Sequence, residues 1–208
     1  MALFNFNAHG WAFQDSLRSI ITSYDAAHEA LDGKAAQALH DIDDYAEAVA
    51  NGAPWEAEYE EGRVLWSKED LLSAHHDEAV SAASTLRKAF VIALYHHWER
   101  HALKWVNERQ VTHNQLVLKV KAKGYPVAED LDVLYYLSNL LKHNNGKWGN
   151  KLVEKGRLDF FMFHKAPPED WQHWDNNVVV GPHHINEFFQ IVGMSGPDAN
   201  MVIQPETA

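Results

Sequence analysis

Cysteine is absent from this chain of 208 residues, so neither disulfide bonds nor thiolate metal sites can form. The absence of thiols is compatible with the reducing cytoplasm. No segment approaches the roughly eighteen uninterrupted apolar residues of a membrane-spanning helix. The first ten residues lack the basic and apolar regions of a signal peptide. We therefore expect a cytoplasmic protein that has no contact with a membrane.

Basic residues are scarce outside one segment. Residues 1–80 contain 4 basic residues (Lys or Arg) and 16 acidic residues (Asp or Glu), a net charge of −12. Residues 166–208 contain no basic and 6 acidic residues, a net charge of −6. Residues 81–165, in contrast, contain 14 basic and 7 acidic residues, a net charge of +7, whereas the whole chain has a net charge of −11. The overall charge argues against nucleic acid, because Lys and Arg supply most of the affinity for phosphate. The middle segment, however, is compatible with a cationic surface for RNA, unless the oppositely charged segments pack against one another.

Several enzyme signatures are also missing. The sequence contains no glycine-rich phosphate loop, no nucleophile elbow and no dinucleotide-binding fingerprint. These absences argue against the usual nucleotide hydrolases and serine hydrolases, and we expect no cofactor.

Helical periodicity extends over most of the chain. Apolar residues recur at three- and four-residue steps in a first helix that ends at Asp32-Gly33 and in a second over residues 34–50. A capping box at Ser67 and Asp70 begins a long helix that ends near residue 108, and shorter helices cover residues 114–123, 127–143 and 183–192. Residues 151–163 fit helix or strand equally, residues 178–180 fit a short strand, and an irregular tail follows residue 194.

This pattern predicts an all-α fold, a bundle of about five to seven helices with a short strand near the C-terminus. We divide the chain into an acidic helical pair over residues 1–66, a helical core over residues 67–165 and a C-terminal extension over residues 166–208. The connection at residues 53–66, which contains Pro54 and a run of glutamates, marks the first boundary.

The most informative segment lies at the end of the helix over residues 127–143. Leucines 131, 134, 137 and 141 share one face of that helix, whereas Tyr136, Asn139 and His143 lie on the opposite face. A phenol, an amide and an imidazole together can bind a polar ligand or transfer a proton. Alternatively, His143 caps the helix, because Asn144-Asn145-Gly146 is a typical helix stop.

The segment from Asn139 to Gly146, together with the preceding helix around residues 90–99, resembles the HEPN superfamily of higher-eukaryote and prokaryote nucleotide-binding domains. Many HEPN domains are metal-independent RNases of toxin–antitoxin and phage-defence systems. The resemblance implies a site made of an arginine, a polar residue directly after it and a histidine four to six positions beyond the arginine. Asn139 matches the polar residue and His143 the histidine, but Ser138 stands in place of the arginine. A serine hydroxyl cannot replace that phosphate-binding cation.

Other residues could complete such a site. Lys142 or Arg100 could supply the cation, Asn144 follows the histidine, and Tyr136 could line the pocket. The superfamily often has an acidic residue on the facing helix, a position that Glu99 matches, although Glu99 could equally pair with its basic neighbours. The resemblance further implies a homodimer, and an antitoxin or other protein as partner. It requires no metal or cofactor.

Two functional hypotheses follow. In the first, the protein is a metal-independent endoribonuclease in which His143 moves a proton and Asn139 positions the phosphate. In the second, it is a non-catalytic helical module that binds RNA, a nucleotide or a protein partner. A third and weaker hypothesis is a metal site, because His97 and His101 lie at positions i and i+4 of one helix. The Glu of a zinc-protease motif is misplaced between them.

Overall fold

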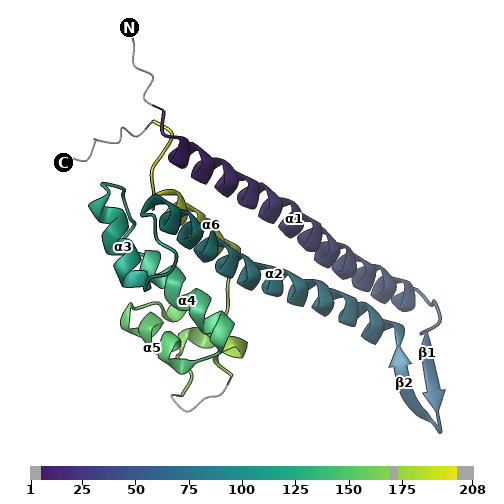
Figure 1. The fold of residues 1–208 in the computed structure, drawn as a ribbon. Coiled ribbons are helices and arrows are strands. Elements are labelled where there is room, and N and C mark those ends of the chain that lie inside the picture. The colour runs from purple at the N-terminus through teal and green to yellow at the C-terminus, as the bar shows by residue number, and fades with distance from the viewer. Residues whose placement is uncertain (1–5, 169–172, 201–208) are drawn as a thin grey trace, which may run out of the picture. The chain divides into compact units, whose positions relative to one another are not determined.

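The computed structural model describes residues 6–168 and 173–200. Within them the fold is all-α, with six α-helices and one small antiparallel sheet, as the periodicity predicts (Figure 1). None of the helices in these two ranges combines the length and the apolar character needed to cross a membrane. Residues 169–172 and 201–208, which belong to the expected C-terminal extension and tail, lie outside the described residues.

Two long helices dominate the element order. Helix α1 (Ala8–Ala50) is followed by strands β1 (Ala57–Glu60) and β2 (Arg63–Ser67) and by helix α2 (Lys68–Trp105). The prediction of a break at Asp32-Gly33 is wrong, since α1 continues through both residues. The cost of about 1 kcal/mol for an interior glycine is small enough for the rest of a 43-residue helix to outweigh it.

The connection at residues 53–66 forms a β-hairpin, which the sequence pattern did not predict. Its strands pair in antiparallel register from Ala57 with Ser67 to Glu60 with Arg63. Glu61 and Gly62 both have positive φ, at 47° and 80°, as the two-residue turns of tight hairpins require. The predicted capping box is confirmed, because Ser67 Oγ accepts from the N–H of Asp70, whose carboxylate accepts from the N–H of Ser67. It marks the start of α2.

Four shorter helices complete the fold: α3 (His113–Ala122), α4 (Leu131–His143), α5 (Gly146–Glu154) and α6 (Pro182–Gly193). Three short 3-10 helices, η1 (Leu158–Phe160), η2 (Met162–His164) and η3 (Trp174–Asn177), lie between α5 and α6. The expected strand at residues 178–180 is reduced to a single bridge between Phe161 and Val178. Helix α4 starts four residues later than expected.

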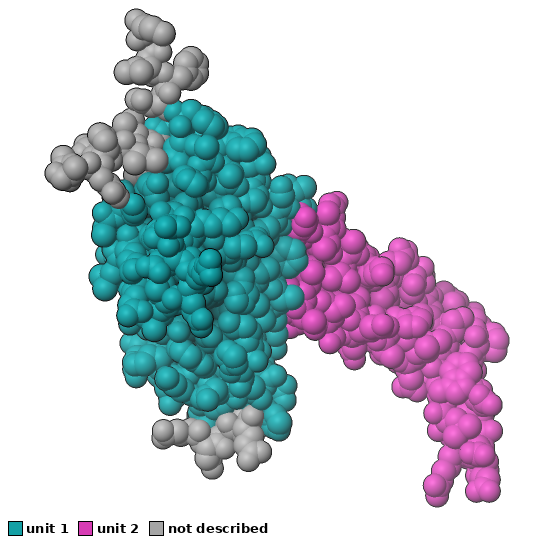
Figure 2. Space-filling model, in the orientation of Figure 1, with its two compact units in different colours: residues 1–22, 87–208 teal, residues 23–86 magenta. Residues whose placement is uncertain are grey.

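The chain divides into two compact units (Figure 2). Unit 1 contains residues 1–22 and 87–208, and unit 2 contains residues 23–86, so the boundaries between the units fall inside α1 and α2. Unit 1 holds the large core, which includes Trp98, Leu134, Leu137, Phe160 and Phe188.

The expectation of an irregular tail after residue 194 is correct for secondary structure but misses its packing. Ser195 is buried, and its carbonyl accepts from the indole N–H of Trp98 at 2.7 Å. The Ser195 hydroxyl accepts from the N–H of Ala128 and donates to the carbonyl of Ile191. The backbone N–H of Asn7 donates to the carbonyl of Ala199. These bonds hold the described part of the tail against unit 1.

Candidate functional site

Helices α4 and α5 meet at a sharp corner. Asn144 adopts the left-handed conformation, with φ 46° and ψ 48°, and its Oδ1 accepts from the backbone N–H of Asp175 at 3.1 Å. Asn145 then caps α5, because its Oδ1 accepts from the backbone N–H of Lys147 at 2.9 Å. The helix stop predicted at Asn144-Asn145-Gly146 is thereby confirmed.

Two glycines let the buried indole of Trp174 approach the backbone of α5. A Cβ atom at Gly149 would lie 2.2 Å from the six-membered part of the indole, and one at Gly146 would lie 2.8 Å from the indole nitrogen. Both distances are far shorter than a van der Waals contact, so only glycine fits at either position. The pair Gly146 and Gly149 therefore sets how closely η3 packs on α5.

The residues of the HEPN-like motif are exposed to different degrees. His143 is exposed at the last position of α4, without a hydrogen bond or ion pair to any described residue. Asn139 is buried, and its Nδ2 donates to the carbonyl of Tyr135 in the same helix. Ser138 is fully buried, with no hydrogen-bond partner for its hydroxyl in the described chain. Position 138 faces the core, where a long charged side chain such as arginine would be unfavourable.

The supporting residues divide into two groups. Lys142 is exposed, with its Nζ 6.0 Å from the centroid of the Tyr95 ring, and Tyr136 is half-buried. Glu99 Oε1 instead lies 3.4 Å from the Tyr95 hydroxyl and its Oε2 lies 3.1 Å from His96 Nδ1, and no hydrogen bond joins Glu99 to His143 among the described residues. Arg100 is exposed on α2. Thus Lys142, His143 and Tyr136 remain available for a ligand, whereas Glu99 contacts Tyr95 and His96 of its own helix.

Aromatic side chains gather beside this corner. Tyr135, Tyr136 and Trp148 are all half-buried. Trp148 stacks on Tyr136 with centroids 6.2 Å apart, and its edge meets Tyr135 at 5.3 Å. Lys147 Nζ lies 5.0 Å from the centroid of the Trp148 ring. We call the set Tyr135, Tyr136, Lys142, His143, Lys147 and Trp148 the α4–α5 surface.

The sequence pattern does not predict most of this aromatic group. It indicates Tyr136 as a pocket residue, but neither Tyr135 nor Trp148, and Trp148 belongs to a helix that the pattern does not predict. The adjacent tyrosines are the available signal, because two neighbours on a helix are about 100° apart and cannot both face the core.

A chain of polar contacts lies beneath Tyr135 and joins α2, α3 and α4. The Tyr95 hydroxyl lies 3.1 Å from His113 Nδ1, and His113 Nε2 lies 3.0 Å from Asp132 Oδ1. The second oxygen of Asp132 accepts from Lys155 Nζ at 3.3 Å. Both Tyr95 and His113 are buried. The spacing of these residues in the sequence gives no indication that they meet.

The ionisation states in this chain follow from burial and hydrogen bonding. Burial lowers the pKa of His113 despite the adjacent carboxylate. Burial alone would raise the pKa of Asp132, but hydrogen bonds from His113 and Lys155 lower it below its usual value. An ionised Asp132 only accepts, so His113 Nε2 carries the proton and Nδ1 accepts from the Tyr95 hydroxyl. Burial raises the pKa of Tyr95. His113 and Tyr95 are thus neutral, hydrogen-bonded supports for the α4–α5 surface.

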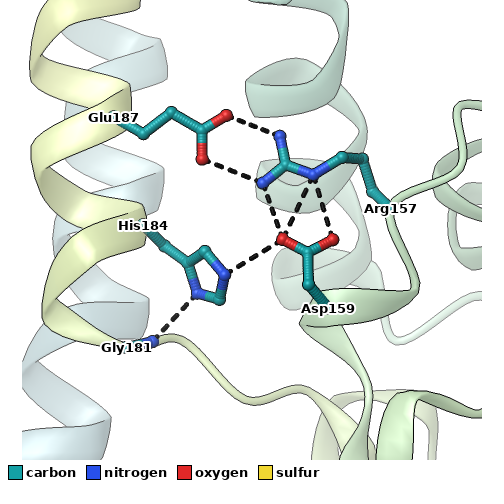
Figure 3. Close-up of polar contacts among 5 residues, drawn as sticks. All are labelled: Arg157, Asp159, Gly181, His184 and Glu187. Atoms are coloured by element: carbon teal, nitrogen blue, oxygen red, sulfur yellow. Dashed lines mark hydrogen bonds and ion pairs between the residues drawn. The ribbon is translucent and has the colours of Figure 1, made fainter.

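A second polar cluster joins the segment after α5 to α6 (Figure 3). Arg157 binds both oxygens of Glu187, at 2.6 and 2.9 Å, and also the carboxylate of Asp159. His184 Nε2 lies 3.1 Å from Asp159, while its Nδ1 accepts from the N–H of Gly181. Each charge faces an opposite charge, and the guanidinium also lies 4.3 Å from the Phe160 ring. These contacts identify a structural cluster.

The structure gives no support to a metal site at His97 and His101. His97 is buried and stacks on Phe13 with ring centroids 5.1 Å apart. His101 Nε2 lies 3.4 Å from the Ser16 hydroxyl. Throughout residues 6–168 and 173–200, no three His, Asp or Glu side chains are grouped so that they could hold a metal ion.

An open hollow of about 430 Å³ adjoins the α4–α5 surface. It is lined by Asn145, Gly146, Lys147, Asn150, Lys151 and Glu154. Lys151 is paired with Glu154 at 2.6 Å, whereas Lys142 and Lys147 form no ion pair with any residue in the described ranges. The corner therefore combines unpaired cations, an exposed imidazole and aromatic faces.

Comparison of the chain with protein-family models, with curated proteins and with solved structures finds no match.

Proposed function

We propose that the protein binds single-stranded RNA at the α4–α5 surface. The observation that carries this proposal is a lysine without an ion pair in the described residues beside half-buried aromatic rings, since Lys147 lies over Trp148 and Trp148 stacks on Tyr136. Proteins that bind single strands combine cations that contact the phosphates with aromatic rings on which bases stack. The HEPN resemblance independently favours RNA as the ligand.

Five of the six residues of the surface contact the RNA in this proposal. Tyr136 and Trp148 offer their faces to bases, while Lys142 and Lys147 contact the flanking phosphates. His143, exposed between them in the sequence, contacts the phosphate or the 2′-hydroxyl. Asn139 takes no direct part, because it is buried and its amide already donates to the carbonyl of Tyr135. The proposed surface thus binds without the arginine of the HEPN motif.

Endoribonuclease activity is the second candidate function, and the exposure of His143 favours it. An imidazole without a partner in the described chain is free to accept a proton from a 2′-hydroxyl or to donate one to a leaving oxygen. The cation that stabilises the transition state would then be Lys142 or a group from a second copy of the chain. A homodimer would bring two α4–α5 surfaces to one RNA.

Binding is tested by fluorescence anisotropy with a labelled, mixed-sequence single-stranded RNA. Replacing Trp148 by alanine should weaken binding about tenfold, since one base–aromatic stack contributes roughly 1–3 kcal/mol. The matched control is Trp66→Ala, an exposed tryptophan of β2 that should leave the affinity unchanged. Equal effects of the two substitutions, or no binding by the native chain, would refute the proposal.

The contribution of the lysines is tested through the salt dependence of the same titration. The slope of log K against log salt should fall by about 0.7 when Lys147 is replaced by glutamine, because one phosphate contact is lost. Lys121→Gln on α3 is the control, and it should leave the slope unchanged. A slope that Lys147→Gln leaves unaltered would contradict the phosphate contact.

Cleavage is tested by incubating the RNA in EDTA with the native chain and with His143→Ala. Loss of cleavage in the variant alone identifies the enzyme, because the activity then depends on the exposed imidazole and on no metal ion. Binding without cleavage by the native chain identifies the non-catalytic module.

A further inference from the structure

Unit 2 has almost no core of its own. Of its residues 23–86, the only buried ones are Tyr24, Ala38, Ser67, Ala79 and Ala83. Apart from Tyr24 these are alanines and a serine, which bury little apolar area, so the burial within this unit stabilises it only weakly. Both strands of its hairpin are exposed on both faces from Glu58 to Trp66. An isolated two-stranded hairpin is only marginally stable in water.

The same unit exposes large apolar side chains. They are Leu39, Trp55, Tyr59, Val64, Leu65, Trp66, Leu71 and Val80, each at least 44% exposed. Trp55 also borders a groove of about 210 Å³ between α1 and α2, together with Ile42, Tyr45, Val49 and Leu72. The rings of Trp55 and Tyr59 meet edge to face, with centroids 6.3 Å apart. Exposed apolar residues in such number on one small unit indicate a binding surface.

The net charge of unit 2 indicates what charge a partner should have. The unit contains 3 Lys or Arg and 15 Asp or Glu, a net charge of −12. Of the three cations, Lys68 is already paired with Glu56 at 2.8 Å. Nucleic acid and anionic lipid are therefore repelled, and so is the same surface of a second copy. A basic protein surface is complementary to it.

We propose that unit 2 is the docking surface for a basic protein partner, which inserts apolar side chains into the groove beside Trp55 and against the hairpin. The acidic residues around the groove and hairpin attract the partner, and its apolar residues cover the exposed rings and leucines. This inference is independent of RNA binding, because the residues that carry it all lie within residues 23–86.

The proposal is tested with three synthetic helical peptides of equal length, titrated into the full chain by calorimetry. One peptide has an apolar face of leucine and a polar face of lysine. The second replaces lysine by glutamate, and the third replaces leucine by serine. The lysine–leucine peptide should bind at least tenfold more tightly than either of the others. If the third peptide, with lysine and serine, bound as tightly as the lysine–leucine peptide, the binding would depend on charge attraction without apolar docking, and the proposal would be overturned.

Variants locate the binding. The double variant with Trp55→Ser and Leu65→Ser should bind the lysine–leucine peptide at least tenfold more weakly than the native chain. Leu118→Ser, at a 67% exposed position on α3, should leave the affinity unchanged. The circular dichroism of the double variant should equal that of the native chain, since both side chains are exposed.

Sedimentation equilibrium tests whether a second copy of the chain is the occupant. A dimer of the native chain that Trp55→Ser and Leu65→Ser dissociate would overturn the assignment to a basic partner.

Discussion

The imidazole of His113 lies parallel to the phenol ring of Tyr135, with the ring centroids 4.1 Å apart and 5° between the planes. His113 is also held by Tyr95 and Asp132, so its orientation is determined from both ends of the ring. The stack transmits that orientation to Tyr135, which in turn contacts Trp148. The buried histidine thereby helps to position the α4–α5 surface.

Replacing His113 by leucine should lower the free energy of unfolding by about 2–3 kcal/mol, because two hydrogen bonds are lost and the buried Tyr95 hydroxyl loses its imidazole partner. Urea denaturation measures the change. The control is His40→Leu, since the His40 side chain is 65% exposed and should contribute little. A loss below about 0.5 kcal/mol for His113→Leu would show that the polar chain is not a structural support.

Gly149→Ala should lower the free energy of unfolding by about 1–3 kcal/mol, because its Cβ would overlap the indole of Trp174 and force η3 away from α5. Gly33→Ala is the matched substitution in open space, with no atom within 4 Å of the new Cβ. It should raise the stability by about 0.5–1 kcal/mol, since alanine is the better helix former. Thermal unfolding of the two variants should therefore shift in opposite directions. A stabilising Gly149→Ala would contradict the observed packing.

Arg157→Met should destabilise the chain by about 2 kcal/mol, because Asp159 and Glu187 lose their shared cation. Their partial exposure keeps the loss below that of a fully buried pair. The double variant with Glu187→Met should recover part of this loss, since one unpaired carboxylate is removed with its partner. Double-mutant analysis of chemical denaturation gives the coupling energy. Additive losses from Arg157→Met and Glu187→Met would show that the observed ion pair contributes nothing.

Acidification should destabilise the protein through His97. Burial first, and then the neighbouring His101, lower the pKa of His97 from 6.5 to about 4. The folded chain therefore favours the neutral ring, so its stabilising contribution is complete above about pH 6.5 and is lost as the pH falls towards 4. The loss is about 2 kcal/mol after allowance for relaxation around the charged ring.

His97→Phe provides the test of that pH dependence. Phenylalanine keeps a flat ring against Phe13 but cannot gain a proton, so the fall in the free energy of unfolding between about pH 7 and pH 4.5 should be smaller in the variant. Identical pH profiles for the two proteins would assign the acid sensitivity to other groups.

Local chemistry determined much of this fold. The all-α class, the capping box at Ser67, the end of α4 at Asn144 and the span of α6 were all predictable, because they depend on periodicity and on contacts within a few residues. The lack of cysteine likewise excluded disulfides and thiolate metal sites by composition alone. The predicted break at Gly33 failed because the rest of a long helix outweighs the intrinsic cost of one glycine.

Only the tertiary structure decided which side chains meet. The imidazole of His113 in α3 contacts Tyr95 in α2 and Asp132 in α4. The indole of Trp174 packs closely against two glycines of α5. Helical periodicity also placed Asn139 beside His143 on a polar face, whereas packing buries the first and exposes the second. Sequence spacing sets the angle of a residue around its own helix, but the neighbouring helices determine which angles face solvent.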